Sequence, residues 1–369
     1  MEESHSSGSV SIKRFGFLAG PISFLLILLL VDSDFISPGA YKVLAVATWM
    51  IIWWITEAAP VPIAALLPLI LFPFLGVMKM SEAAAPYANP IIFLFMGGFM
   101  IALGLEKHRL HERIALNLIK VTGTSGNGII LGFLIATGFI SMWISNTATA
   151  MMMLPIAISV INLLSTERNN TPETTSVGER NFGIGLMLVI AYAANIGGIA
   201  TIIGTPPNVV FVGLLDQFYH QKMEFGKWML VGLPLSLLLL ATCYLIITRL
   251  LFPNRLEKIY GADTLIKNKL AELGSIRHEE KLVMAIFSLT CSLWIFQQPL
   301  NLLFGKEILN DTNIAMGGGS LMFIVPSSLK EFKFLLHWRD TEKLAWGILI
   351  LFGGGLCLAQ GLSNAGIIQ

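Results

Sequence analysis

Residues 140–150 have the sequence Ile-Ser-Met-Trp-Ile-Ser-Asn-Thr-Ala-Thr-Ala and place five hydrogen-bonding side chains inside a long apolar stretch. These side chains belong to Ser141, Ser145, Asn146, Thr147 and Thr149. In such apolar surroundings, polar groups and non-helical backbone are tolerated only where they line a cavity or are buried in protein. This run therefore marks a point where we expect an apolar helix to be interrupted.

The spacing of these polar side chains permits two local structures. On a continuous helix, hydroxyls that recur every four residues form one polar stripe and bond back to carbonyls one turn earlier. In a helical hairpin, the Ser-Asn-Thr of residues 145–147 forms the tip between the apolar arms 128–144 and 148–164. The contiguous polar triplet favours a re-entrant hairpin, which would offer carbonyls to a cation and N–H groups to an anion.

A second interruption is predicted inside the apolar segment 181–216. Residues 195–208 have the sequence Asn-Ile-Gly-Gly-Ile-Ala-Thr-Ile-Ile-Gly-Thr-Pro-Pro-Asn. Pro206 and Pro207 have no N–H, so we expect the carbonyls one turn before them to be unpaired and available to a hard cation such as Na⁺. A simple kink in the helix is the alternative.

The composition identifies an all-α polytopic membrane protein. The 369 residues are 55% hydrophobic and 13% charged, against about 25% charged in soluble domains. The 24 basic and 23 acidic residues nearly cancel, which argues against a nucleic-acid partner. The three cysteines and six histidines form no metal-ligand or catalytic-triad spacing, so neither an enzyme nor a cofactor is predicted.

About 20 apolar residues are needed to cross a bilayer. Besides the hairpin, the predicted spans are 15–31, 41–57, 60–78, 88–105, 181–216, 227–251, 281–301, 311–326 and 342–362. With the N-terminus in the cytoplasm, fifteen lysines and arginines fall on the inner side and four on the outer side, as the positive-inside rule requires. We therefore predict a multi-pass protein of the cell membrane with a cytoplasmic N-terminus.

Two polar segments are also predicted. Residues 106–122 are expected to form an amphipathic helix on the inner membrane surface, and residues 252–280 a long polar linker. Glu57 is either a functional acid within the membrane or a helix-end group with a capping or packing role, and its place beside a turn favours the second.

Residues 94–105 and 351–362 are an internal repeat with seven of twelve positions identical. The predicted topology runs the two copies in opposite directions, the inverted-repeat plan of secondary transporters. In the first copy the surface helix and hairpin follow the repeat, whereas the sequence ends at Gln369 shortly after the second copy. We therefore expect a partial sequence that stops before a second hairpin and its final helices.

Together these motifs resemble the divalent-anion/sodium symporter family, the INDY-type dicarboxylate carriers. The resemblance includes the stretch 53–73 (WWITEAAPVPIAALLPLILFP) and extends from about residue 40 to the end. It implies a scaffold domain, a transport domain that moves as an elevator, and a homodimer. The predicted division is 1–127 scaffold with the surface helix, 128–251 transport domain, 252–280 linker and 281–369 second-repeat scaffold helices.

The resemblance also assigns roles to particular residues. It implies Na⁺ binding by Ser141, Ser145, Asn146 and Gly204, substrate-carboxylate binding by Asn146, Thr147 and Thr205, and a supporting role for Pro206, Pro207 and Asn208. A second Ser-Asn-Thr would hold the other carboxylate. The only later candidate, Ser363-Asn364-Ala365, lacks the threonine.

The predicted function is symport of Na⁺ with C4 dicarboxylates such as succinate, malate or fumarate. The motif has no lysine or arginine, so neutral donors, helix dipoles and Na⁺ would have to attract the anion. Alternatives are a citrate or sulfate symporter, or a sodium-independent exchanger, of the same family. From a different class, the chain is an ion channel or a membrane sensor.

Overall fold

The computed structural model describes residues 3–30, 38–166 and 176–367. The chain forms two compact units, one from residues 1–93 with 345–369 and the other from residues 94–344. The predicted division into scaffold and transport domains concerns movement in a membrane and stays a prediction.

All secondary-structure elements in the described part of the first unit are helices. Its elements are α1 (Glu3–Leu30), α2 (Pro38–Thr56), α3 (Val61–Ala64), α4 (Leu67–Phe74), α5 (Met80–Ala84), the 3₁₀ turn η1 (Ala85–Ala88) and α17 (Trp346–Asn364). Phe24, Met50, Phe72 and Cys357 belong to its buried apolar core. Glu57, just after α2, is 3.1 Å from Lys13 and its side chain is 70% exposed, which fits a helix-end role.

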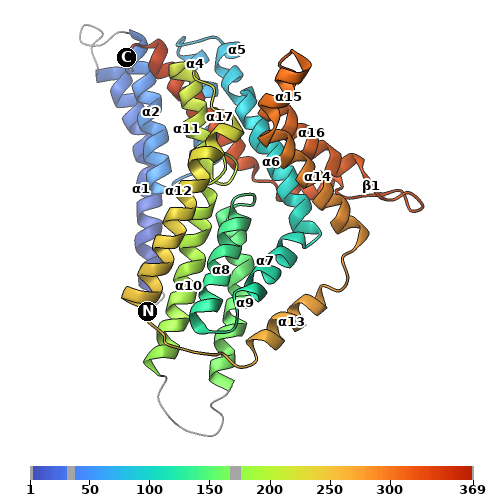
Figure 1. The fold of residues 1–369 in the computed structure, drawn as a ribbon. Coiled ribbons are helices and arrows are strands. Elements are labelled where there is room, and N and C mark those ends of the chain that lie inside the picture. Colours follow the sequence, from blue (N-terminus) through green and yellow to red (C-terminus); the bar gives the residue numbers. More distant parts are fainter. Residues whose placement is uncertain (1–2, 31–37, 167–175, 368–369) are drawn as a thin grey trace. The chain divides into compact units, whose positions relative to one another are not determined.

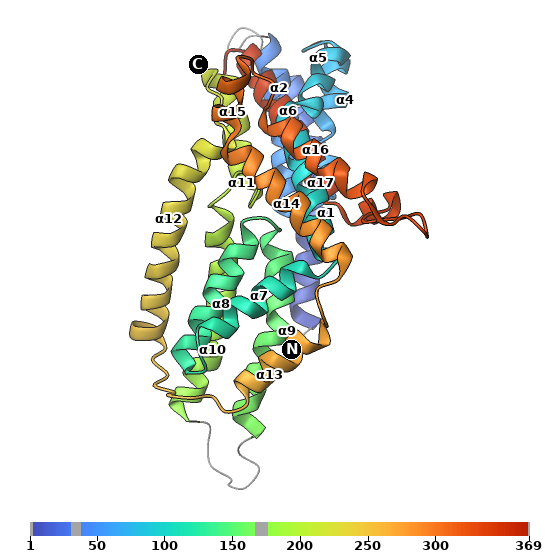
Figure 2. The same ribbon diagram turned by 45° about the vertical axis from the view of Figure 1, so that its right-hand side comes forward.

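The second unit contains the predicted hairpin and broken helix. Its helices are α6 (Pro90–Lys107), α7 (Leu110–Val121), α8 (Gly126–Ser141), α9 (Asn146–Thr166), α10 (Val177–Gly198), α11 (Pro206–Tyr219), α12 (Phe225–Leu245), α13 (Ala262–Glu272), α14 (His278–Ile295), α15 (Gln297–Phe304) and α16 (Asp311–Ile324). A π-helical turn η2 (Ile246–Leu251), the antiparallel strands β1 (Pro326–Ser328) and β2 (Lys333–Phe334), and the 3₁₀ turn η3 (Trp338–Lys343) complete it. In Figure 1 and Figure 2, α8, α9 and α10 lie side by side and α12 runs along α10.

By length and hydropathy, seven helices of the described ranges are able to cross a membrane, or eight if one bent pair is a single span. The bent pair is α14 and α15, which meet at 70°, so the expected span 281–301 is broken. The expected span 60–78 is divided into α3 and α4, because it contains four prolines. The expected span 311–326 is the 14-residue α16, which stops before Pro326.

The two copies of the internal repeat use their glycines in the same way. Gly97 in α6 lies against the backbone of Ala315 in α16, and a β-carbon at Gly97 would overlap that backbone. Gly354 in α17, the aligned residue of the second copy, lies in the same way against the carbonyl of Ala65 after α3. Each copy therefore uses a glycine to let a second backbone approach closely.

The predicted surface helix is α7, which begins at Leu110 after Arg109 adopts a left-handed conformation with φ of 55°. Its buried side chains include Leu110, His111, Leu116 and Ile119, while charged residues lie on its other side. The amphipathic helix is therefore confirmed, although its apolar face is covered by protein. The polar linker 252–280 contains one helix, α13, which packs against α7.

Candidate functional site

The hairpin predicted around the Ser-Asn-Thr motif is present as a helix–turn–helix. Helix α8 ends at Ser141, α9 begins at Asn146, and a short turn joins them. Because the helix is interrupted, Ser141, Ser145 and Thr149 do not form one helical stripe, and that alternative is wrong. Within the turn, Ser145 Oγ accepts a hydrogen bond from the N–H of Ala148 at 3.3 Å.

Ser141 does not bond back along its own helix. Its hydroxyl oxygen is 2.6 Å from the carbonyl oxygen of Ala194 in α10 and 2.7 Å from Oδ1 of Asn146. The hydroxyl carries one proton and therefore donates to only one of these two acceptors at a time. Three oxygens from α8, α9 and α10 thus meet at one buried point.

Asn146 connects the hairpin to the end of α10. Its Nδ2 donates to Oδ1 of Asn195 at 3.1 Å, and its own Oδ1 faces Gly198. A β-carbon at Gly198 would lie 2.7 Å from Asn146 Oδ1 and 3.2 Å from Cβ of Thr205. We call this meeting of Ser141, Asn146, Asn195 and Gly198 the Asn146 junction.

The predicted break in the next span is also present. Helix α10 ends at Gly198 and α11 begins at Pro206, with Thr205 as its N-cap residue. The two prolines occupy the first positions of a helix, where a missing N–H leaves no bond unmade. The prolines therefore start the helix that follows the predicted break.

Side chains satisfy much of the backbone at this break, a feature that the sequence did not predict. Asn208 Nδ2 donates to the carbonyls of Gly198 and Thr201, at 2.9 and 2.8 Å. Trp228 Nε1 and Ser236 Oγ from α12 each donate, at 2.9 Å, to one further carbonyl of this region. Polar residues in the otherwise apolar α12 were the available signal for these contacts.

The hairpin turn and the break are also joined directly. Thr201 is fully buried and its hydroxyl donates to the carbonyl of Met142 in the turn at 2.5 Å. The ring of Trp143, next in the turn, packs edge-on against Phe287 of α14 with centroids 4.9 Å apart. The turn is therefore fixed on two sides.

Two oppositely oriented helix ends meet at the Asn146 junction. The N-terminus of α9 begins at Asn146 and carries partial positive charge, whereas the C-terminus of α10 ends at Gly198 and carries partial negative charge. An anion is favoured on the α9 side and a cation on the α10 side. The motif itself contains no charged side chain.

The structure brings some predicted site residues together and not others. Ser141, Asn146, Gly204 and Thr205 converge around Gly198. Ser145 and Thr147 are exposed at the hairpin tip, so their contacts with an ion or substrate stay predictions. The described residues contain no group of three or more His, Cys, Asp or Glu side chains placed to hold a metal ion.

Comparison with known proteins adds independent information. Residues 13–369 match the family model described as the sodium:sulfate symporter transmembrane region. The chain is 41% identical over 355 residues to the sodium-dependent dicarboxylate transporter SdcS of Staphylococcus saprophyticus, covering 95% of this chain and 68% of that protein. It is 40% identical over 358 residues to SdcS of Staphylococcus aureus strain NCTC 8325, with 96% and 68% covered.

Proposed function

Because this chain belongs to the sodium:sulfate symporter family, we propose that it transports dicarboxylates such as succinate, malate or fumarate together with Na⁺. Membership confirms the family predicted from the motifs, which is a family of membrane transporters and not of enzymes. The observation that carries the proposal is the Asn146 junction, where uncharged oxygens and two helix ends meet. The names of the two SdcS relatives support the same substrate class.

The cation would bind on the α10 side of the junction. Ser141 Oγ and Asn146 Oδ1 lie 2.7 Å apart, and Gly204 packs on Gly198 beside them. When the Ser141 hydroxyl donates its proton to the carbonyl of Ala194, no hydrogen lies between Ser141 Oγ and Asn146 Oδ1. The two oxygens then repel each other, and a cation bound between them would relieve this repulsion. We assign Na⁺ to Ser141, Ser145, Asn146 and the backbone around Gly204, because hard cations prefer oxygen ligands.

The anion would bind on the α9 side. Asn146, Thr147 and Thr205 supply neutral donors for one carboxylate, and the α9 N-terminus adds positive partial charge. Without a basic side chain in the motif, bound Na⁺ provides the remaining positive potential, so Na⁺ is expected to bind first. Pro206, Pro207 and Asn208 support the site by fixing the start of α11 and the carbonyls of Gly198 and Thr201.

The wider architecture follows from the family resemblance and remains part of this proposal. A homodimer formed by scaffold domains would leave each transport domain free to move as an elevator. The inner excess of basic residues supports a cytoplasmic N-terminus. Cysteine labelling from each side of the membrane tests the orientation, and light scattering of the purified protein tests the dimer.

Sulfate is the second candidate substrate, because it appears in the family description. A site made of neutral donors and Na⁺ suits either divalent anion. Competition distinguishes them: if labelled sulfate is taken up and excess sulfate, but not excess succinate, abolishes that uptake, the substrate assignment to dicarboxylates is wrong.

The proposal is tested with the purified chain in liposomes. We expect uptake of radiolabelled succinate under an inward Na⁺ gradient and only background uptake when K⁺ replaces Na⁺. Asn146→Ala is expected to remove both uptake and Na⁺ dependence. The control Thr242→Ala alters an exposed residue of α12 that bonds only within its own helix, and it should retain uptake. Sodium-driven uptake by Asn146→Ala at the unmutated rate would refute the site, and sodium-independent uptake by the unmutated protein would refute symport.

A further inference from the structure

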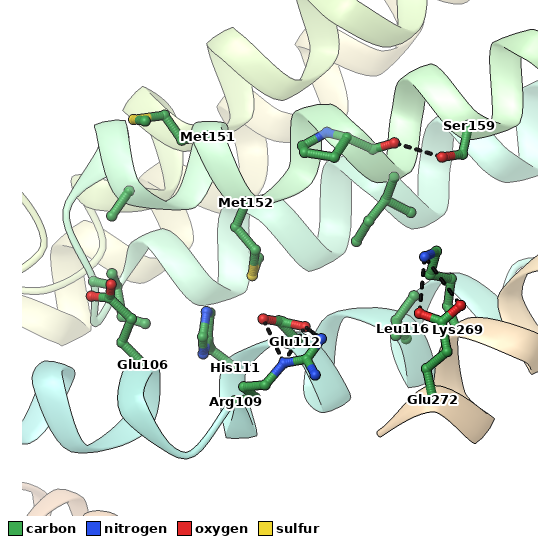
Figure 3. A pocket seen from close by; sticks show the side chains of 14 residues that line it. Glu106, Arg109, His111, Glu112, Leu116, Met151, Met152, Ser159, Lys269 and Glu272 are labelled. Atoms are coloured by element: carbon green, nitrogen blue, oxygen red, sulfur yellow. Dashed lines mark hydrogen bonds and ion pairs between the residues drawn. The ribbon is translucent and has the colours of Figure 1, made fainter. Parts of the chain in front are cut away.

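A cavity of about 610 Å³ lies between the surface helix α7, the second hairpin arm α9 and the linker helix α13 (Figure 3). Its volume falls within the range of about 300–1,000 Å³ that is usual for small-molecule sites. All of its lining residues belong to the second unit. Ile144 and Ala148 line it near the hairpin tip, but the cavity includes none of the residues of the Asn146 junction.

The two walls of this cavity differ in character. Met151, Met152, Pro155 and Ile156 form an apolar wall on α9. Figure 3 shows Met152 pointing from α9 toward His111 and Glu112 on α7. Met151 is 68% exposed, and methionine side chains adapt readily to different apolar ligands. The side of a bound molecule that faces α9 would therefore have to be hydrocarbon.

The opposite wall, on α7 and α13, is charged, but both of its cations are already paired. Arg109 donates to Glu112 at 2.7–3.1 Å, and Lys269 Nζ lies 2.9 Å from Glu272 Oε2. Among the described residues, no basic side chain lies within ion-pair distance of Glu106. The Glu106 carboxylate therefore remains as an unpaired negative charge that a ligand could neutralise.

His111 adds a second acceptor to this wall. Its Nδ1 lies 2.9 Å from the carbonyl oxygen of Leu105, and because a carbonyl only accepts, Nδ1 carries the proton. Nε2 is then a lone-pair acceptor, and no donor from the described part of the chain reaches it. Burial lowers the pKa of His111, and the carboxylates of Glu112 and Glu106 oppose this effect only in part. Because the pKa is lowered overall, the ring is neutral near pH 7.

We propose that this cavity binds a membrane lipid with a primary-ammonium head group. The ammonium would donate to the Glu106 carboxylate and to Nε2 of His111, and the acyl chain would lie along the methionine wall. A quaternary ammonium has no N–H to donate, and an anionic head group would face an unpaired carboxylate. A small soluble amine shares the head-group chemistry but leaves the apolar wall uncovered.

Binding is tested by native mass spectrometry of the purified full chain in detergent. The probes are short-chain phosphatidylethanolamine, phosphatidylcholine with the same acyl chains, and free ethanolamine. We expect the ethanolamine lipid to bind about tenfold more tightly than the choline lipid, the size of effect for charge-assisted hydrogen bonds. Equal binding of the two lipids would overturn the proposal.

Three variants locate the binding. Glu106→Gln keeps the shape but removes the charge, and it should lower binding of the ethanolamine lipid to the level of the choline lipid. Met152→Trp should fill the cavity and weaken both lipids. Asp263→Asn removes a carboxylate from the exposed Asp263–Lys267 pair of α13 outside the cavity, and it should bind as the unmutated protein does.

The outcomes are distinct for each source of the ligand. Unchanged binding by Glu106→Gln refutes the site, even if Met152→Trp fails to fold. Displacement of the lipid by ethanolamine at equal concentration identifies a soluble amine as the ligand and overturns the assignment to a lipid. Succinate uptake is not part of this readout, so failure of the transport proposal leaves the result interpretable.

Discussion

Gly204 lies on Gly198, and a β-carbon at Gly204 would come within 2.5 Å of the Gly198 carbonyl oxygen and 2.9 Å of its Cα. Both of these neighbours are backbone atoms, so no side-chain rotation relieves the overlap. The two glycines therefore let the segment 199–205 fold back on the end of α10. This contact fixes the distance between the break and Asn146.

Gly204→Ala is expected to reduce sodium-driven uptake by at least about tenfold, because the segment 199–205 must move away from Asn146. The overlap should also lower the stability of the fold by about 1–3 kcal/mol. Uptake in liposomes and the melting temperature in detergent measure the two effects. Gly317→Ala in α16 is the matched control, since nothing lies within 4 Å of its added β-carbon. Equal uptake by both alanine variants would contradict the role of the close approach.

Asn208 is expected to be the main stabiliser of the broken end of α10. Asn208→Ala leaves the buried carbonyls of Gly198 and Thr201 without their donor and should destabilise the protein by about 2 kcal/mol. Asn208→Asp should destabilise the protein more than Asn208→Ala does, because a carboxylate would face those carbonyls. Thermal unfolding in detergent measures both, with Asn117→Ala on the exposed side of α7 as control. The prediction fails if Asn208→Ala has the same melting temperature as the unmutated protein.

Arg113 joins α7 to the start of α14 through a buried ion pair. Its Nε is 2.6 Å from Glu280 Oε2, and Nη1 and Nη2 donate to the carbonyls of Gly274 and Leu273. Glu280→Leu strands the charge of Arg113 and should destabilise the protein by about 3–5 kcal/mol. Arg113→Met should destabilise it less, because Arg277 Nε lies 3.3 Å from Glu280 Oε1 and stays as a partner. The double variant should melt above either single variant.

Chemical or thermal unfolding of the four proteins forms a double-mutant cycle for this pair. Strictly additive losses would show that the two side chains do not act together. Asp263→Asn, from an exposed pair, should change stability by less than about 1 kcal/mol.

His111 is expected to make the protein sensitive to acid. Its pKa is lowered in the folded protein by burial, so the unfolded chain takes up a proton first as the pH falls. The stability contribution of the neutral ring is complete above its ordinary pKa of about 6.5 and is lost as the pH falls toward the lower pKa of the folded state. The melting temperature should therefore fall less between pH 7.5 and 5 in His111→Gln than in the unmutated protein. An equal fall in both would contradict this, and His278→Gln, at an exposed position, is the control.

Much of the architecture was predictable because it depends on local chemistry. Hydropathy located the long helices, and the Ser-Asn-Thr triplet located the hairpin turn, since a polar triplet in an apolar segment has few other structures. The less accurate predictions were those that depended on the length of a helix. Residues 311–326 have enough apolar side chains for a span, but Asn310 caps the helix at one end and Pro326 stops it at the other.

The sequence alone determined where the chain is apolar, where its helices break and which family it resembles, because periodicity, glycine, proline and polar triplets act over a few residues. Only the tertiary structure decided what those breaks contact. Ser141 bonds to Ala194 in another helix, and Trp228 and Ser236 reach across to carbonyls at the end of α10. Such contacts join residues 29–53 positions apart, and their geometry depends on how whole helices pack.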